Sequence, residues 1–345
     1  MRNTTYYFKQ ISGWIVALAV AAVICNVSCF AFYNPLQELK REHGSTTGFL
    51  LPNSHGVYGL EGYCAASVDQ NGYVNRDIPR ADEYYVVAGA SHTEGLFIPE
   101  KYRYSDLLSD MLYDDGLAHT VNIGKSGNFF SVVLQHLDGI LGEFPDAKGI
   151  IIETDSLAYD TKALYDSMIQ TGYDPDETAG SILSSMDGRT RTVIKVKQAL
   201  PLLRELHKQY YTYLDSVRSS DSGSDILDPD FWRSEYEGDF ETALDDLMKY
   251  LRNSTDQQIV ILYHPAISLE EDGSMKILTN NAEGYYKKVC ADNDIIFVDM
   301  TERFLQAYEE EHIIPYGFNN TAPGEGHINR QAHKMIAEEL AEVLK

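Results

Sequence analysis

Basic residues are scarce in this chain. Among 345 residues, 28 are Lys or Arg and 52 are Asp or Glu, so the formal net charge at pH 7 is −24. A field of that sign repels nucleic acids and anionic membrane surfaces, and we expect neither as the main partner of the protein. The apolar content of 44% is ordinary, and the length suffices for one large folded domain or two small ones.

Cysteine is scarce as well, with four residues at positions 25, 29, 64 and 290. The sequence has no CxxC pair and no Cys/His spacing typical of a zinc site, so it implies no metal and no organic cofactor. Cys64 and Cys290 would form a disulfide only if they met in space. The simpler interpretation is two unpaired, partly buried thiols.

One long apolar run stands near the N-terminus. Ile11–Tyr33 is almost uninterrupted by polar residues and is long enough to cross a membrane once as a helix. Arg2 and Lys9 precede it without any acid, and the charges within residues 38–42 balance. The positive-inside rule therefore predicts an N-terminus in the cytoplasm and the rest of the chain outside it.

Two alternatives to an anchor remain open for this run. A cleaved signal peptide would have a shorter apolar core and a small-residue cleavage site, and we find no good one. A lipoprotein signal would end at Cys29, but Asn26 occupies the place where a leucine is usual. We therefore predict a tail (1–10), a transmembrane anchor (11–33) and a juxtamembrane connector (34–80).

Beyond the connector, short apolar runs alternate with amphipathic segments up to the C-terminus. We predict strands over residues 84–88, 119–123, 149–152, 258–263 and 295–298. We predict helices over residues 104–112, 130–141, 193–214 (interrupted by Pro201), 240–251 and 329–344. This alternation is typical of an α/β three-layer sandwich with a central parallel sheet, formed by residues 81–345 with a helical insertion at about 156–256.

Three polar segments directly follow predicted strands: Gly89–Gly95, Asn122–Asn128 and Glu153–Ser156. Ligands of parallel α/β sheets bind beyond the carboxyl ends of the strands, so we expect these segments to form one site. Ser91 would lie at a strand-to-helix turn with its hydroxyl exposed, as a nucleophile requires. A purely structural interpretation is also open, because Ser91 and Glu94 match a helix capping box.

A candidate general base lies near the C-terminus. His327 stands between Gly326 and a predicted terminal helix, and a serine hydroxyl needs such a base because it is a poor nucleophile at neutral pH. His333 falls within the helix and is expected to be a packing or capping residue. His264, which follows the fourth predicted strand, is the reserve candidate for the base.

Together these segments resemble the conserved blocks of SGNH/GDSL hydrolases. Gly89–Gly95 (GASHTEG) is similar to block I, typically GDSLTEG, and Asn122–Gly127 is similar to block II, N-x-G-x-S-G. His327–His333 resembles block V, H-x-N-x-x-x-H, and the three lie in family order over about residues 83–345. The resemblance implies an SGNH hydrolase/flavodoxin-like fold, Ser91 as nucleophile, and a Gly127 N–H in the oxyanion hole.

Block III departs from the family pattern. The family has G-x-N-D there, and this chain has Asp155 at the position of the asparagine that donates to the oxyanion. An ionised carboxylate would repel an oxyanion. The oxyanion hole would therefore take a hydroxyl from Thr154 or Ser156, or depend on the N–H groups of Ser91 and Gly127.

Block V departs as well. The family places an aspartate three residues before the histidine, and this chain has Gly324 there. Glu325 stands two residues before His327 instead, a spacing that resembles the D-x-H of alginate-type O-acetyltransferases. We predict that Glu325 orients the His327 imidazole.

These features predict an extracytoplasmic serine esterase or O-acyltransferase that acts through a covalent acyl-serine. The expected substrate is an acylated carbohydrate or another ester, and acetyl esters of cell-envelope glycans fit the outward orientation and the 24 tyrosines, whose rings can stack on sugars. The alternative is a catalytically impaired binding or assembly protein of the cell envelope that keeps the fold. Asp155 and Gly324 are the residues that favour this alternative.

Overall fold

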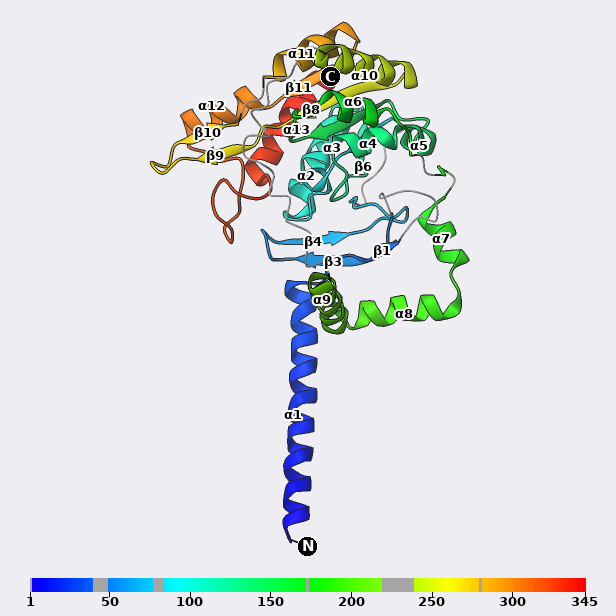
Figure 1. The fold of residues 1–345 in the computed structure, drawn as a ribbon, viewed down its shortest axis with the longest axis vertical. Coiled ribbons are helices and arrows are strands. Elements are labelled where there is room, and N and C mark those ends of the chain that lie inside the picture. The colour runs from blue at the N-terminus through cyan, green and yellow to red at the C-terminus, as the bar shows by residue number, and fades with distance from the viewer. Residues whose placement is uncertain are drawn as a thin grey trace.

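The computed structural model describes residues 2–39, 49–76, 83–171, 174–175, 177–218, 239–278 and 281–345. A five-stranded parallel sheet forms the centre of the folded body (Figure 1), with strand order β11-β8-β7-β5-β6. The strands are β5 (Tyr84–Ala88), β6 (His119–Asn122), β7 (Gly149–Thr154), β8 (Gln258–Tyr263) and β11 (Ile296–Asp299).

The predicted α/β fold class is confirmed. All five predicted strands are present within two residues of their expected ends, and every pairing in the sheet is parallel. The chain runs from β5 outward to β6 and then returns to β7 on the other side of β5, which is the flavodoxin-like order. Ligands of such sheets bind where the strand order reverses, which here is beyond the carboxyl ends of β5 and β7.

Helices cover both faces of the sheet. One face packs against α4 (Phe130–Gln135), α5 (Leu137–Glu143), α6 (Thr161–Ser167), α10 (Phe240–Ser254) and α11 (Glu283–Asp292). The other face packs against α3 (Tyr104–Asp114), α12 (Thr301–Glu311) and α13 (Arg330–Leu344). These layers form the predicted three-layer sandwich.

The side chains of each strand alternate between the two layers. In β5, Val86 and Ala88 face the first layer, and Tyr85 and Val87 face the second. All four are at most 1% exposed. Burying an aliphatic side chain to this degree contributes about 1.5–3 kcal/mol, which explains why a continuous apolar run here becomes a central strand.

The structure divides two of the predicted helices. The helix expected over residues 130–141 is α4 followed by α5, with a break at His136, whose Nδ1 lies 2.7 Å from the Val132 carbonyl oxygen. The helix expected over residues 193–214 is α8 (Gly188–Ala199) followed by α9 (Pro201–Arg218). Pro201 has no N–H to donate to a preceding turn, so a new helix begins there.

The segment before the sheet contains the long N-terminal helix and small antiparallel pairs. Helix α1 (Arg2–Phe32) projects from the body (Figure 1), and its Tyr6–Phe32 portion is long and apolar enough to span a membrane. A signal sequence would have the same properties. Residues 40–48 and 77–80 of the predicted connector lie outside the described residues, and the charge balance expected within residues 38–42 falls partly among them.

The connector folds against the body. Strands β1 (Glu38–Leu39) and β2 (Phe49–Leu50) pair, and β3 (His55–Tyr58) pairs with β4 (Cys64–Ser67). Cys64 is the first residue of β4 and Cys290 lies in α11; both are buried and both are free thiols. The remaining short elements are η1 (Glu100–Tyr102), α7 (Ala179–Ser185), β9 (Ile267–Leu269) and β10 (Met275–Ile277).

Candidate active site

Ser91 is the first residue of α2 (Ser91–Glu94), a single turn that directly follows β5. Its Oγ lies 2.8 Å from Nε2 of His327, 236 positions later in the chain. The helix cap is Ala90, which makes no side-chain capping bond. Ser91 and Glu94 therefore do not form the capping box that the sequence left open, and the Ser91 hydroxyl faces an imidazole.

His327 lies just before α13, where Asn329 caps the helix by accepting hydrogen bonds from the N–H groups of Gln331 and Ala332. The Asn329 amide also donates to the Ile314 carbonyl at 2.7 Å, which fixes the start of the helix. The Phe97 ring stacks on the imidazole of His327 with ring centroids 3.8 Å apart. The start of the terminal helix and the Phe97 ring therefore orient the imidazole of His327.

A carboxylate from the connector completes the arrangement. Glu61 Oε2 lies 2.8 Å from Nδ1 of His327, and Glu61 Oε1 accepts the His327 backbone N–H at 2.6 Å. With Nδ1–H donating to Glu61, Nε2 is left to accept the Ser91 proton. The three side chains form the linear hydrogen-bonded arrangement of an acid–base–nucleophile triad.

The loop that carries Glu61 is Gly59–Tyr63, the turn between β3 and β4. The Asn320 side chain accepts the Gly62 N–H at 2.8 Å and donates to the Gly59 and Gly62 carbonyls. Gly326 permits the close approach, because a Cβ added there would lie 2.1 Å from Glu61 Oε1. The glycine before the candidate base thus makes room for its carboxylate.

The structure does not bring Glu325 to the imidazole as the sequence led us to expect. The Glu325 side chain is exposed, and within the described part of the chain it makes no recorded contact with His327. The carboxylate position is taken by Glu61, which approaches from the opposite end of the sequence. The E-x-H spacing alone therefore does not place the acid.

Three residues of the block II segment, Asn122, Gly124 and Ser126, contact the turn that carries Ser91. The Asn122 amide donates to the Thr93 carbonyl at 2.7 Å, and Ser126 donates through both its N–H and its hydroxyl to Glu94 Oε2. A Cβ on Gly124 would lie 2.5 Å from Thr93 Cγ2. These contacts hold the loop that ends at Gly127 against helix α2.

The candidate oxyanion donors are placed differently from one another. The backbone N–H groups of Ser91 and Gly127 have no recorded hydrogen-bond partner among the described residues. The Thr154 hydroxyl instead donates to the Ser156 carbonyl at 2.6 Å, and Thr154 is 3% exposed. The two backbone groups are therefore free to meet an oxyanion, whereas the Thr154 hydroxyl is committed to its own turn.

Asp155 contacts His92, a neighbour of the base, and has no recorded hydrogen bond to Ser91 or His327 among the described residues. Its Oδ2 is 3.7 Å from Nε2 of His92, and the His92 ring packs on the ring of His327 at a centroid distance of 4.9 Å. Burial and, secondly, the nearby Glu153 charge raise the Asp155 pKa. Burial lowers the His92 pKa well below its usual value, so this histidine is neutral beside the base.

His264, the reserve candidate for the base, is enclosed beneath the site. It is 0% exposed, its Nε2 lies 3.0 Å from Glu153 Oε1, and its Nδ1 lies 2.9 Å from the Tyr316 hydroxyl. Glu153 Oε2 accepts hydrogen bonds from the Ala90 N–H and the Thr93 hydroxyl, both at 2.9 Å. The pair supports the turn that carries Ser91 and has no direct contact with its hydroxyl.

His333 packs as the sequence predicted. It is 2% exposed, its Nδ1 accepts the Tyr104 backbone N–H at 3.0 Å, and its ring stacks on the Tyr104 ring. It therefore joins α13 to α3 and lies apart from the reacting groups.

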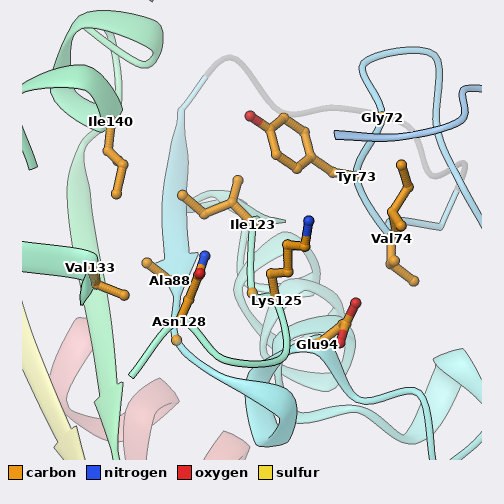
Figure 2. Close-up of a pocket in the computed structure, with 13 residues that line it drawn as sticks. Gly72, Tyr73, Val74, Ala88, Glu94, Ile123, Lys125, Asn128, Val133 and Ile140 are labelled. Atoms are coloured by element: carbon orange, nitrogen blue, oxygen red, sulfur yellow. The ribbon is translucent and has the colours of Figure 1, made fainter. Parts of the chain in front are cut away.

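A small cavity lies behind the block II loop (Figure 2). Glu94, Lys125 and Asn128 line it on one side, and Tyr73 and Val74 of the connector line it on another. Its volume is about 30 Å³, which is room for no more than about two water molecules. The cavity lies between the connector and the sheet, and it is too small for a substrate.

Comparisons with known proteins gave similar solved structures at low sequence identity. No protein-family model matches the sequence, and no curated protein sequence matches it. One similar solved structure is LAE5, an α/β hydrolase from the metagenome of Lake Arreo, Spain. It is 14% identical, the match covers 77% of this chain and 96% of that chain, and the TM-score is 0.39.

Two further solved structures are similar at the same level. A member of the lipolytic protein G-D-S-L family from Veillonella parvula is 12% identical, with 76% and 97% of the two chains covered and a TM-score of 0.36. The acetyl xylan esterase AlAXEase is 13% identical, with 75% and 98% covered and a TM-score of 0.42. Such low values leave the function to be inferred from the residues of the site.

Proposed function

We propose that the chain is a membrane-anchored serine esterase or O-acyltransferase whose active site is the Ser91–His327–Glu61 triad. The observation that supports this most strongly is the pair of 2.8 Å contacts that joins the three side chains in order. Such an order prepares a hydroxyl for attack on an ester, because the base accepts its proton while the acid holds the base in the correct tautomer.

In the first step Ser91 Oγ bonds to the acyl carbon and its proton passes to His327 Nε2. The oxyanion that develops meets the N–H groups of Ser91 and Gly127. The bond to the leaving alcohol then breaks, and the alcohol departs with the proton from His327. An acyl-serine and a neutral imidazole remain.

In the second step His327 takes a proton from water or from a sugar hydroxyl, and the resulting nucleophile attacks the acyl-serine. Ser91 leaves and recovers its proton from the imidazole. Water as acceptor gives hydrolysis, and a sugar hydroxyl gives acyl transfer. Phe97 and His92 both pack on the His327 ring and so occupy space next to the base. We therefore propose a small acyl group, with acetyl the simplest.

The proposed location is the outer face of a membrane. Helix α1 supplies the anchor, and Arg2 and Lys9 in its N-terminal part orient the domain outward. An enzyme held there meets envelope glycans, whose O-acetyl groups are esters of the required kind. Acetylated glycans are therefore the proposed substrate class.

Labelling with a fluorophosphonate probe tests the activated serine. We expect a stoichiometric adduct on Ser91, because a hydroxyl activated by an imidazole attacks phosphorus as it attacks an acyl carbon. Mass spectrometry of the labelled peptide identifies the residue, and Ser91→Ala is the matched control. A folded protein that takes up no probe would support the alternative, a binding or assembly protein that keeps the fold.

Asp155 is the feature that favours this alternative, and its substitution gives a separate prediction. An ionised Asp155 opposes an oxyanion, whereas an amide supplies a permanent N–H donor. We expect Asp155→Asn to raise kcat/KM for an acetyl ester by about tenfold or more. Below the Asp155 pKa the wild type keeps an O–H donor, so the gain should be small there and should grow as the pH rises through that pKa.

The measurement is kcat/KM against pH for both proteins. Asp146→Asn, at an exposed position away from the site, is the matched control and should leave the profile unchanged. A loss of activity in Asp155→Asn, or a gain that is the same at every pH, would show that Asp155 does not face the oxyanion.

A further inference from the structure

Helices α8 and α9 carry a charge opposite to that of the rest of the protein. Residues 188–208 hold six of the 28 Lys and Arg residues of the chain and one of its 52 Asp and Glu residues. The six are Arg189, Arg191, Lys195, Lys197, Arg204 and Lys208. Lys197, Arg204 and Lys208 line a pocket against the connector, and Arg191 donates to the carbonyls of Met186 and Ser184. Arg189 and Lys195 are exposed, and they are the basic residues of α8 that an anionic surface outside the protein would meet.

Helix α8 also exposes an apolar stripe. Val193, Val196 and Leu200 recur at helical spacing on one side of it, and they are 45%, 46% and 40% exposed. Ile194 points the other way, into a core cluster with the connector. Arg189, four residues before Val193, lies on the same side of the helix and is exposed. An exposed apolar stripe edged by basic residues is the pattern of a helix that lies in a membrane interface.

The junction of the two helices is fastened to α1. The Asn26 amide donates to the Ala199 carbonyl at 3.3 Å, and Asn26 Oδ1 accepts the Leu202 N–H at 3.2 Å. These bonds satisfy a polar side chain inside the candidate membrane span together with two backbone groups at a helix boundary. Figure 1 shows α8 running across the axis of α1 at the end nearest the body.

An apolar corner adjoins this junction. It has a volume of about 370 Å³ and lies between Val23 and Val27 of α1 and Leu203 and Leu206 of α9. Leu203 and Leu206 are 57% and 59% exposed. Such a corner beside a membrane-spanning helix fits the acyl chains of lipids.

The position of the junction along α1 indicates its depth in a bilayer. Asn26 lies six residues before Phe32, so it is about 9 Å from the end of α1 along the helix axis. The 27-residue apolar portion is about 40 Å long, whereas the hydrocarbon core of a bilayer is about 30 Å thick. The surplus lies in the interfacial layers, and the junction lies near the boundary between headgroups and acyl chains.

We propose that α8 and α9 form an interfacial support that lies on the bilayer in which α1 is inserted, with Arg189 and Lys195 against anionic lipid headgroups. This inference rests on the proposed anchoring through α1. It gives the helical insertion a role, because the support sets the height and tilt of the active site above the membrane.

The support is connected to the triad through the connector. Arg204 donates to the Asn34 side chain at 2.9 Å, and Asn34 pairs with Val57 of β3 through two backbone hydrogen bonds. Strand β3 leads directly into the loop that carries Glu61. The part of the molecule nearest the membrane therefore also positions the carboxylate of the site.

Depth-dependent fluorescence quenching tests the proposal in the full chain. A nitrobenzoxadiazole label is attached at Val193→Cys in a Cys25→Ala/Cys29→Ala background, because the other two cysteines are buried. The protein is inserted in vesicles of phosphatidylcholine and phosphatidylglycerol that contain lipids spin-labelled near the headgroup. We expect strong quenching at position 193 and none at Tyr285→Cys, an exposed position on α11.

A third label separates this proposal from the anchor. Val16→Cys, in the middle of α1, should be quenched by lipids that are spin-labelled deep in the acyl chain. Absence of that quenching would contradict the anchor itself. Quenching at Val16 without quenching at Val193 would overturn the interfacial support alone. The same result is expected if Val193 contacts a second copy of the chain and not lipid.

The charge contribution has its own control. Arg189→Glu/Lys195→Glu should weaken quenching at Val193 in the anionic vesicles and should have little effect in vesicles of phosphatidylcholine alone. Each basic residue near an anionic surface contributes about fivefold to binding, so two reversals are expected to reduce the docked fraction clearly. Equal effects in both vesicles would overturn the recognition of anionic headgroups.

Discussion

Ser91→Ala is expected to reduce hydrolysis of a small acetyl ester, such as p-nitrophenyl acetate, by roughly 10⁵–10⁶-fold. The substitution removes the oxygen that forms the acyl intermediate and leaves the base without a proton to accept. The fold should persist, because the Ser91 hydroxyl caps no helix and the turn is held through Glu153 and Thr93. Thermal unfolding of the variant should match that of the wild type.

A matched control separates this effect from general loss of a hydroxyl. Ser274, whose hydroxyl bonds Asp272 in the exposed β9–β10 turn, can be replaced by alanine with little expected change in rate. Substantial activity in a folded Ser91→Ala protein would remove Ser91 from the mechanism and with it the proposed covalent intermediate.

Glu61→Gln is expected to lower kcat by about 10³–10⁴-fold with little change in KM. Glu61 accepts two hydrogen bonds from His327, one from the backbone N–H and one from Nδ1. An amide has only one oxygen, so it loses one of these bonds or turns an N–H toward the imidazole and favours the wrong tautomer. The defect therefore affects the base and leaves substrate binding in place.

Glu325→Gln is the matched control for this prediction. It removes a carboxylate of the same kind two residues before His327, at an exposed position, and its rate should stay within about twofold of the wild type. The opposite pattern, with a large loss in Glu325→Gln and none in Glu61→Gln, would return the role of the acid to Glu325. Aspartate at position 61 should restore less than the full rate, because its shorter side chain does not reach both donors.

The sheet could be predicted because its pattern is local. Runs such as Gln258–Tyr263 are apolar on both faces, and only a central strand or a buried helix accommodates such a run. The division of a helix at Pro201 was also local. The break at His136 was not predicted, since no proline or glycine marks it. Tertiary contacts decide where the first helix ends and the second begins.

Part of the site could be predicted for the same reason. Ser91 follows β5, Asn122 is the last residue of β6, and His327 shortly precedes α13. The motifs carry these positions in their spacing. Glu61 could not be predicted. It is one of 52 acids, it stands in a connector without regular period, and its only signal was indirect, in that Gly324 leaves the base without the usual carboxylate.

The sequence by itself determined the layered α/β architecture, the apolar N-terminal helix and the serine and histidine that meet at the sheet edge. These follow from periodicity and from motifs within a few residues of one another. Only the tertiary structure decided which carboxylate reaches His327, that the Thr154 hydroxyl is committed to its own turn, and that α9 packs against α1. The reason is physical, because a hydrogen bond across 266 positions depends on how loops pack, and local sequence does not encode that packing.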